Sequence, residues 1–442
     1  MEEFDVIVVG GGISGLICAY TLAQKELSVV LFERADIGTK NVSGGRLYAH
    51  TLRGIEGLED FDTACERAIV CEKLGFMDDE STFMMESRTT LSDDKFSNSY
   101  SVLQNKFLNY LSNKCEELGV MVASNVLVDD LLVKLENGEI VKSSSLNRAL
   151  NSNESVVGIK AGEDEMNAKY VVLAEGLNSL LAQSIDLQAS NDGNNSFIGK
   201  NYALGIKEVI ELPVSSRFAL NDKEGLAALY AGKASDYLMG GGFLYTNENT
   251  ISLGCVIGLG RNMNKKSHEI FEDFKNHPSI APIIKDGKTL EYSAKLVPEG
   301  GFNAMSKLGA NGVLVVGDAA GFCMNLGYTV RGMDLAIMSA KNAALAISTA
   351  ISENKNALEA YKVNLEKEGS FLDFKQFNQV GEFLEHNERM FNNYPKELNI
   401  LMKSLFKIDG KSEPIKTKVM RFVKSIGIMN LIKDAWKGSK VL

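Results

Sequence analysis

The chain has 442 residues, of which 45% are hydrophobic and 24% charged, and its formal net charge is -10. This length suggests two or three domains, and the composition is that of an ordinary globular protein. The acidic balance, with an isoelectric point near 5.2, argues against nucleic acid as a partner. Because residues 4–9 already read as a strand of the fold, we expect no signal peptide, and we expect no membrane-spanning segment.

The cysteines and histidines exclude several kinds of site. None of the six cysteines forms a C-x-x-C pair, which argues against a locally built zinc site or iron–sulfur cluster. Scattered cysteines are typical of a reducing compartment, so we expect a cytoplasmic protein. With only four histidines, the chain has little material for a metal hydrolase or a histidine-based triad, and we expect no bound metal.

The first fifteen residues carry the strongest signal. An apolar run over residues 4–9 leads directly into Gly10, Gly12 and Gly15, spaced as G-x-G-x-x-G, and a helical pattern follows. In such a turn the first glycine permits the bend, the second lets the backbone approach a pyrophosphate, and the third lets helix and strand pack closely. The anion would lie at the helix N-terminus.

A second strand, predicted over residues 27–32, ends at Glu33, near the spacing expected for an acid that binds an adenosine ribose. The sequence therefore predicts a dinucleotide site. The alternative is a β-α-β turn whose glycines serve packing alone.

The next segments are less informative. Arg46 follows a glycine-bearing turn, where it could contact a phosphate or cap a helix. The patterns predict a helix and then irregular structure over 50–75, strands of a second domain over 76–100, a helix from Val102 to about Leu118, short strands over 120–122 and 125–128, and an exposed hairpin or loop insertion over 137–155.

Two later strands end in small and acidic residues. A buried-strand pattern over 170–174 leads to Glu175 and Gly176, and another over 312–316 leads to Gly317 and Asp318. Such strand ends point to the cofactor edge of a parallel sheet. Asp318 could be a helix N-cap, but together with the N-terminal turn a second cofactor contact is the better interpretation. A largely buried helix is predicted over 330–351.

The remaining chain divides in two. Residues 200–295 show the alternation of an antiparallel sheet, and the glycine run 240–242 within it could form a bulge or admit a flat substrate. Residues 353–442 read as helical. From Ile415 onward seven Lys/Arg stand against one Asp, interleaved with apolar residues and Trp436. This tail could lie on an anionic membrane, or dock on the protein body or an acidic partner.

Together, the N-terminal G-x-G-x-x-G, the central Ala-Glu-Gly-Leu-Asn-Ser at 174–179 and the distal Gly-Asp-Ala-Ala-Gly at 317–321 resemble the marks of the glutathione-reductase-type FAD fold. More closely, the chain resembles the FixC group of the electron-transfer-flavoprotein:quinone oxidoreductase family. The segments that carry this resemblance are residues 40–50, 239–249, 317–321 through 331–336, and 430–434.

The resemblance implies an α/β FAD-binding domain with an inserted antiparallel-sheet substrate domain and a helical C-terminal region. Residues 1–75, 101–199 and 296–352 would form the FAD-binding domain. Residues 76–100 and 200–295 would form the substrate (quinone) domain, and 353–442 the helical region with its basic amphipathic tail.

The resemblance also implies site residues. Noncovalent FAD would have its pyrophosphate on the glycine turn, its adenosine ribose on Glu33 and its ribityl chain on Asp318, while the segment from Gly327 to Arg331, at a helix N-terminus, would face the flavin pyrimidine. The candidate cofactor-binding residues are Gly10, Gly12, Ile13, Ser14, Gly15, Glu33, Arg34, Gly45, Arg46, Gln104, Val126, Glu175, Gly176, Gly317, Asp318, Gly327, Thr329 and Val330. The candidate quinone contacts are Gly241, Gly242, Phe243 and Tyr245. No catalytic residue is assigned.

The implied partners are a two-subunit electron-transfer flavoprotein of the FixAB type, a quinone and a ferredoxin-like iron–sulfur subunit. The basic tail adds the expectation that a cytoplasmic protein could lie peripherally on the inner face of the cell membrane. Two departures stand out. Gln104 occupies a position where relatives often have arginine, and the four-cysteine module of larger relatives is missing. The chain would therefore act as a subunit.

Three alternatives share the fold. An FAD-dependent reductase of isoprenoid double bonds or an aromatic hydroxylase would oxidise NAD(P)H or another small donor without an electron-transfer flavoprotein. We see no second G-x-G-x-x-G for NAD(P)H. A lipid-escort protein would have lost catalysis and flavin.

Overall fold

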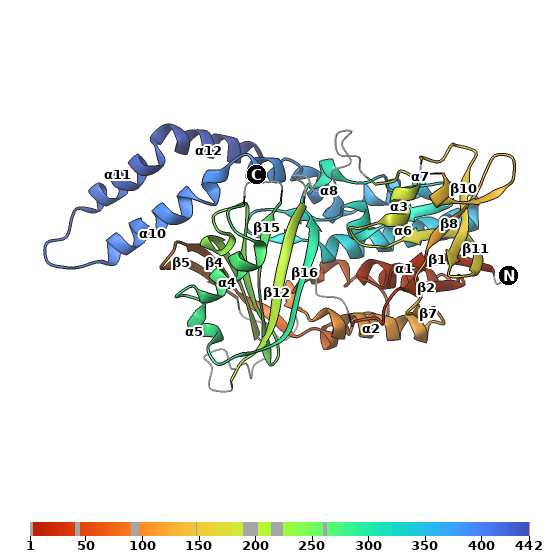
Figure 1. Cartoon of the computed structure of the whole chain (residues 1–442), viewed down its shortest axis with the longest axis horizontal. Helices are drawn as coiled ribbons and strands as arrows, with labels where there is room; N and C mark the ends of the chain where they lie inside the picture. The colour runs from red at the N-terminus through yellow and green to blue at the C-terminus, as the bar shows by residue number, and fades with distance from the viewer. Residues whose placement is uncertain are drawn as a thin grey trace.

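The computed structural model describes residues 3–39, 45–89, 97–146, 148–188, 202–213, 224–259 and 263–441. Two large sheets lie side by side, and a set of helices from the C-terminal part of the chain covers their junction and extends beyond it (Figure 1).

The first sheet has a parallel core in the order β7-β2-β1-β11-β18. Its apolar, β-branched strands are buried, as expected for a sheet covered on both faces. An antiparallel extension, β10-β8-β9, continues from β11. The bounds are β1 Glu3–Val9, β2 Val29–Glu33, β7 Met121–Ser124, β8 Asp130–Lys134, β9 Ile140–Lys142, β10 Ser155–Ala161, β11 Asp164–Leu173, β17 Gly309–Ala310 and β18 Val313–Val315.

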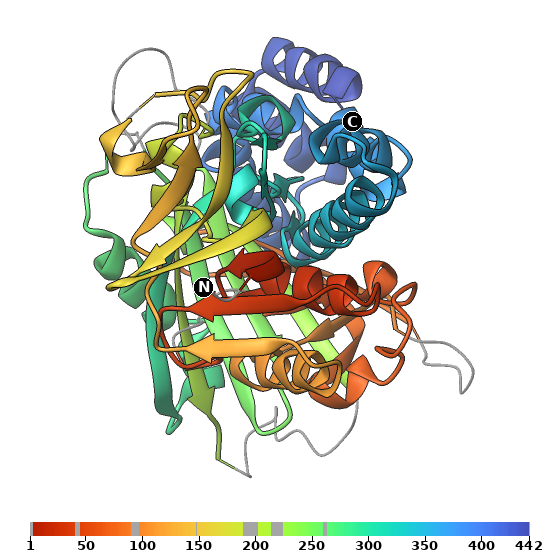
Figure 2. The same cartoon turned by 90° about the vertical axis from the view of Figure 1, so that its right-hand side faces the viewer.

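Three helices form the centre of this layer. The helix α1 (Ile13–Ala23) packs against α6 (Met333–Glu353), and α2 (Gln104–Glu117) packs on α1 (Figure 2). The alanines of α6 let α1 and α7 (Ala357–Leu365) approach it closely. The predicted helix over 330–351 therefore exists, but it begins at Met333, because Val330–Arg331 (β20) pairs with Met324–Asn325 (β19) in a short hairpin.

The second sheet runs in the order β16-β12-β15-β14-β13-β4-β6-β3. Its central strands are antiparallel, as predicted, but β13 pairs with β4 in parallel. The helix α4 (Ser267–Asn276) covers one face through Phe271 and Phe274. The bounds are β3 Arg46–Tyr48, β4 Arg67–Met77, β5 Thr82–Arg88, β6 Ser99–Ser101, β12 Tyr202–Glu211, β13 Glu224–Gly232, β14 Gly240–Thr246, β15 Thr250–Gly258 and β16 Lys288–Pro298, with α5 Ala281–Ile284 and the 3-10 turn η4 Lys233–Ser235 beside them.

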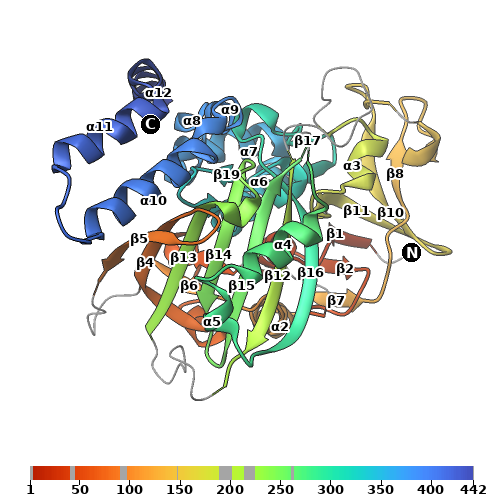
Figure 3. The ribbon, with the colours of Figure 1, turned by 60° about the vertical axis from the view of Figure 1, so that its left-hand side comes forward.

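The C-terminal region is helical, as predicted. The helices α10 (Asn393–Phe406) and α11 (Ile415–Ile426) form an antiparallel arm that extends from the body, and α12 (Ile428–Val441) returns to it (Figures 1 and 3). Asp434 of α12 accepts hydrogen bonds from Arg389 and from the Tyr394 hydroxyl, the latter at 2.9 Å. The remaining helices here are α8 Gly369–Gln376, α9 Val380–Glu385 and η7 Glu388–Met390.

Several expectations were wrong in detail. Residues 50–75 contain only the 3-10 turns η1 (Ala49–Thr51) and η2 (Phe61–Ala64) before β4, whose residues are buried in the second sheet. That sheet therefore takes strands from a segment expected in the first layer. Residues 125–128 form no strand. The expected insertion over 137–155 contains β9 and η3 (Ser143–Ser145) among its described residues.

The expectation about membrane spans needs one correction. By length and composition, α6 could cross a bilayer, because its alanine-rich run carries few charges. However, 67% of its apolar window is buried inside the protein, so α6 is a core helix.

Candidate functional site

The glycine turn joins β1 to α1 at the carboxyl end of the parallel strands. Gly10 has φ +111°, and a Cβ there would lie 2.3 Å from the Ala174 carbonyl oxygen. A Cβ at Gly15 would lie 1.8 Å from the Gly10 oxygen. Gly12, in contrast, would place its Cβ in open space, with nothing within 4 Å. Positions 10 and 15 are therefore closed by packing, while position 12 leaves room for a ligand at the start of α1.

Glu33 is tied to this turn. Its Oε2 accepts the Gly11 N–H at 2.7 Å, and its Oε1 accepts the Ala35 N–H at 3.2 Å. The Val126 N–H donates to the Glu33 carbonyl at 2.9 Å. The glycine turn therefore meets two other predicted residues here, Glu33 and Val126, and Arg34 is exposed beside them.

The distal Gly-Asp motif reaches the same place from more than 300 residues away. Gly317 and Asp318 begin the 3-10 turn η6 (Gly317–Ala320) after β18, and Gly317 has φ +64°. A Cβ at Gly317 would lie 2.6 Å from the Ser14 hydroxyl, so the two motifs are in contact. The Lys295 ammonium of β16 donates to Asp318 Oδ2 at 2.9 Å.

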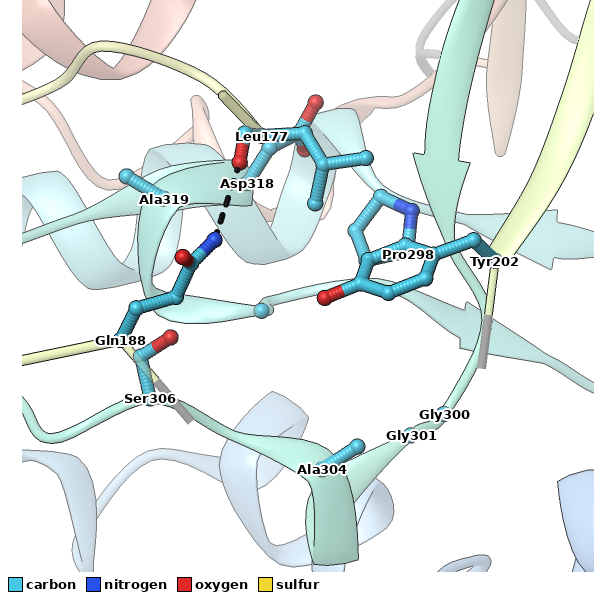
Figure 4. Close-up of a pocket in the computed structure, with 11 residues that line it drawn as sticks. Leu177, Gln188, Tyr202, Pro298, Gly300, Gly301, Ala304, Ser306, Asp318 and Ala319 are labelled. Carbon is cyan, nitrogen blue, oxygen red and sulfur yellow. Dashed lines mark hydrogen bonds between the residues drawn. The ribbon is translucent and has the colours of Figure 1, made fainter. Parts of the chain in front are cut away.

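Asp318 also lines a small cavity of about 20 Å³, room for about one water molecule. Figure 4 shows the Tyr202 ring reaching into this cavity between Leu177 and the Gly300–Gly301 backbone. Gln188 closes one side, where its Nε2 donates to the Leu177 carbonyl at 3.4 Å.

Glu175 does not face this site. Its two carboxylate oxygens accept the N–H groups of Leu181 and Ala182, at 3.0 and 3.2 Å, at the start of α3 (Leu180–Ser184). Burial raises its pKa. Its carboxylate therefore satisfies two N–H groups at the start of α3, and the cofactor contact at Glu175 stays a prediction. The neighbouring Gly176 has φ +73° and open space around its Cβ position.

The predicted flavin-facing segment forms the β19–β20 hairpin just before α6, rather than the first turn of a helix. Gly327, with φ +80°, lies at its tip. The Thr329 hydroxyl is hydrogen-bonded to the Tyr48 hydroxyl at 2.6 Å, which joins the hairpin to β3. Val330 is exposed.

Arg46 lies on β3 and does not cap a helix; its contact with a phosphate stays a prediction. It donates to the Ser99 hydroxyl at 3.0 Å, pairs with Glu72, and lies 4.7 Å above the Tyr48 ring. Gly45 packs against Tyr245, whose ring would lie 2.6 Å from a Cβ at that position. The part of this motif at residues 40–44 lies outside the described residues.

Gln104 begins α2 and is buried. Its Nε2 lies 3.9 Å from the Met333 sulfur at the start of α6. The position therefore lies where the two helices meet, close to the hairpin.

A large cavity of about 910 Å³ lies beside the hairpin, within the size range of ligand pockets. Its walls are mixed, because apolar and charged side chains alternate along the second sheet and polar side chains come from α8. The lining residues are Arg46, Tyr48, His50, Glu72, Lys73, Leu74, Met85, Glu86, Ser87, Asn98, Leu229, Leu326, Tyr328, Thr329, Arg331, Gly369, Ser370, Asp373 and Phe377. Most of these were missed by sequence reasoning because they come from separate segments that only the fold brings together.

The four candidate quinone residues do not line this cavity. A Cβ at Gly242 would lie 2.5 Å from the Phe274 ring, so this position faces α4 and serves close packing. Gly241 packs against the Tyr230 carbonyl, 2.5 Å from its Cβ position. Phe243 and Tyr245 point to the opposite face from Gly242, where their rings stack with centroids 5.1 Å apart. Because side chains alternate between the two faces of β14, the four residues that the sequence grouped as quinone contacts lie on different faces of the sheet.

A buried carboxylate lies next to the hairpin. Glu299 is 4% exposed, its Oε1 accepts from Asn325 Nδ2 at 3.2 Å, and its Oε2 has no hydrogen-bond partner within the described part of the chain. Burial raises its pKa to about 7. Among the described residues, no three His, Cys, Asp or Glu side chains gather as a metal site, and all six cysteines are buried free thiols.

Three segments of the chain match models of known protein families. Residues 5–81 match the model "FAD dependent oxidoreductase", 202–297 match "ETF-QO, ubiquinone-binding", and 380–442 match "ETF-QO/FixC family C-terminal domain".

Two full-length relatives come from Escherichia coli K12. Protein FixC is 41% identical, and the probable electron transfer flavoprotein-quinone oxidoreductase YdiS is 40% identical; each alignment covers 100% of this chain and 99% of the relative.

Solved structures support the fold. A geranylgeranyl bacteriochlorophyll reductase-like protein from Thermoplasma acidophilum superposes with a TM-score of 0.68 at 18% identity, covering 100% of both chains. The myxobacterial FAD-dependent halogenase CndH gives 0.60 at 18% identity, covering 95% of this chain and 86% of its own. At full-length identities of 40–41% to its curated relatives, the chain belongs to the family of electron transfer flavoprotein-quinone oxidoreductases and FixC proteins, and it is an FAD-dependent oxidoreductase.

Proposed function

We propose that this protein receives electrons from an electron-transfer flavoprotein on its FAD and passes them to a quinone. The observation that carries the proposal is the position of the 910 Å³ cavity, which borders the Tyr48–Thr329 contact beside the predicted flavin segment. The names of the full-length relatives and the match to a ubiquinone-binding model support the same donor and acceptor.

The residues at the nucleotide site fit FAD. The open space at Gly12 and the N-terminus of α1 suit a pyrophosphate, while Glu33 suits the adenosine ribose and Asp318 the ribityl hydroxyls. When bound, FAD supplies the redox chemistry, because it can accept two electrons and release them again. The chain's tasks are to hold it, to exclude water and to position donor and acceptor.

The cavity suits a quinone head group. Apolar contacts come from Leu74, Met85, Leu229, Leu326 and Phe377. Polar groups at one end come from His50, Ser370 and Arg331. A quinone has the same division, a flat apolar ring with two carbonyl oxygens. Pockets of this kind typically combine apolar walls with a few placed polar groups.

The finer proposal adds a ferredoxin-like iron–sulfur subunit. Its support is the scattered, buried placement of the six cysteines, which suits no cluster site within this chain. Pull-down of a ferredoxin-like protein by the tagged chain, with transfer of electrons to quinone only in its presence, would test this.

We also propose a cytoplasmic protein that lies peripherally on the inner face of the membrane. On α12, Ile428, Met429, Ile432 and Trp436 are each at least 58% exposed. Lys433 and Lys437 follow on the same helix. An exposed apolar stripe flanked by lysines suits an anionic bilayer surface.

A coupled assay tests the central proposal. The FAD-loaded protein is mixed with reduced electron-transfer flavoprotein and a soluble quinone, with and without the ferredoxin-like subunit, and quinol formation is followed. Quinol that forms only when this chain is present supports the proposal. Electron uptake from NADPH instead of the flavoprotein would favour the double-bond reductase or hydroxylase.

A further inference from the structure

His50 lies at the polar end of the large cavity, on η1 directly after β3. Its side chain is 45% exposed and also lines the cavity, so the ring connects solvent with the cavity interior. Its Nε2 is hydrogen-bonded to the Ser370 hydroxyl of α8 at 2.8 Å. The same nitrogen lies 3.8 Å from Asp334 Oδ2.

Asp334 makes this a suitable place for a transient positive charge. Its side chain is 1% exposed, and its Oδ2 accepts from Arg331 Nε at 2.7 Å. Its Oδ1 is buried and has no hydrogen-bond partner among the residues that the structure describes. A buried carboxylate with an unused oxygen favours a nearby cation. The imidazolium form of His50 is such a cation, and it can gain and lose its charge by protonation and deprotonation.

The charges that face His50 come from several elements. Asp334 and Asp373 are negative, whereas Arg331 and Arg53 are positive. Burial lowers the pKa of His50, and the two carboxylates partly oppose that effect. The imidazolium is therefore a stronger acid than a free one, and its population falls as the pH rises toward neutrality.

The other charged side chains that line the cavity are held in ion pairs. Arg46 pairs with Glu72, Lys73 pairs with Glu86 at 2.9 Å, and Arg331 donates to Asp373 at 3.0 Å. The Tyr48 hydroxyl is bonded to Thr329, and burial raises its pKa. His50 differs from these groups because its ordinary titration range is close to physiological pH.

We propose that His50 is the group that delivers a proton from solvent to a quinone bound in this cavity, with Asp334 holding the imidazolium in place. This inference rests on the proposed function. Reduction of a quinone to a quinol takes up two electrons and two protons, and FAD, when bound in its reduced form, would supply the two electrons and one of the protons. The second proton comes from His50, where an N–H bond breaks as an O–H bond to the quinone oxygen forms. The neutral imidazole then regains its proton from bulk water.

The test separates proton delivery from electron transfer. The FAD-loaded wild-type protein and His50→Gln are reduced anaerobically and then mixed with a water-soluble quinone or with ferricyanide, which accepts electrons without protons. Reoxidation is followed by flavin absorbance across a pH series. His386→Gln is the matched control, because His386 is exposed directly after α9 and its Nδ1 is hydrogen-bonded to the Glu382 carbonyl at 2.9 Å, away from the cavity lining.

We expect His50→Gln to slow reoxidation by quinone by about 10²-fold, the usual size of a general-acid contribution, and to leave the ferricyanide rate unchanged. The wild-type quinone rate should fall with rising pH and be slower in D₂O, and added imidazole should partly restore the rate of His50→Ala. His386→Gln should match wild type.

Equal quinone rates and equal pH profiles in wild type and His50→Gln would overturn the inference while leaving the proposed function intact. Wild-type protein that ferricyanide oxidises but quinone does not would instead overturn the proposed function, and the inference with it. If His50→Gln fails to hold FAD, the wild-type data decide: no solvent isotope effect on the quinone step, and no pH dependence, would contradict the role of His50.

Discussion

Lys295 Nζ lies 2.9 Å from Asp318 Oδ2, and this ion pair joins β16 of the second sheet to η6 at the end of β18 in the first. The carboxylate expected to hold the ribityl chain is therefore anchored to the substrate layer. The Lys295–Asp318 pair therefore connects the predicted FAD site on the first sheet with the second sheet.

This ion pair predicts how three variants should differ in their affinity for FAD. We expect Asp318→Ala to weaken FAD binding about 10–100-fold, since hydrogen bonds to a charged group contribute about 1.5–3 kcal/mol. Lys295→Met should weaken it at most about fivefold, because a partly exposed ion pair contributes about 0–1 kcal/mol. Asp186→Ala, which breaks the exposed pair with Lys307, is the control and should bind FAD normally. Flavin titration by fluorescence measures all three. Equal affinities for wild type and Asp318→Ala would remove Asp318 from the site.

Filling the open space at Gly12 gives a second prediction. Gly12→Trp should fold but retain little FAD, because its side chain would occupy the place left beside the N-terminus of α1. Asn137→Trp, in the exposed turn between β8 and β9, is the control. The ratio of flavin to protein absorbance after purification reports the outcome. Full occupancy in Gly12→Trp would show that FAD does not lie at this turn.

These sites illustrate what the sequence can predict. The turn at Gly10–Gly15 and the Gly-Asp pair at 317–318 are local motifs, so their structure follows from residue type and spacing. The contact of Ser14 with Gly317 also follows, since parallel strands end at one edge.

Other features depended on tertiary contacts. The periodicity of residues 50–75 did not reveal β4, which gains its stability from pairing with β13 and β5. Glu175 looked like a ligand for the cofactor, but the fold places α3 against it. The large cavity combines strands of the second sheet with α8, about 300 residues apart, and no local pattern contains that information.

Glu299 should make stability depend on pH. Its folded pKa of about 7 is above the ordinary 4.5, so the folded protein favours the protonated acid. The contribution of protonated Glu299 to the free energy of unfolding is fully present below about pH 4.5 and is lost as the pH rises through about 7. We expect Glu299→Gln to flatten the pH dependence of unfolding in this window and to stabilise the protein above pH 7 by at most about 3 kcal/mol.

Urea unfolding of the two proteins at a series of pH values measures this. Asn325→Leu removes the hydrogen bond to the carboxyl and should increase the pH dependence. A Glu299→Gln variant whose stability follows the wild-type curve at every pH would show that Glu299 ionises freely in the folded state.

The docking of α12 depends on Asp434. The hydrogen bond from Arg389 lowers the pKa of Asp434, so this contribution is present above pH 3.8 and is lost as the pH falls through the lower folded value. Asp434→Asn should weaken docking by about 1–3 kcal/mol. Hydrogen exchange should then speed up in α12. Glu413→Gln, which breaks the exposed pair with Arg421 on α11, should leave α12 unchanged. Unchanged exchange in Asp434→Asn would exclude this anchor.

The exposed stripe on α12 predicts membrane association. Replacing Met429 and Trp436 together by serine should reduce co-sedimentation with anionic vesicles and leave bound FAD unchanged. Replacing the exposed Leu290 and Tyr292 of β16 by serine is the control. Because each lysine near an anionic surface contributes about 1 kcal/mol, neutral vesicles should retain less of the wild-type protein. If both double variants sedimented equally with the vesicles, the membrane contact would not lie on the exposed stripe of α12.

The most direct test of the central claim is an anaerobic absorbance titration of the FAD-loaded protein with reduced electron-transfer flavoprotein, and separately with NADH and NADPH. We predict that the flavoprotein alone bleaches the flavin band and that a quinone, with the ferredoxin-like partner, restores it. Direct bleaching by NADH or NADPH, with no response to the flavoprotein, would contradict the proposed function.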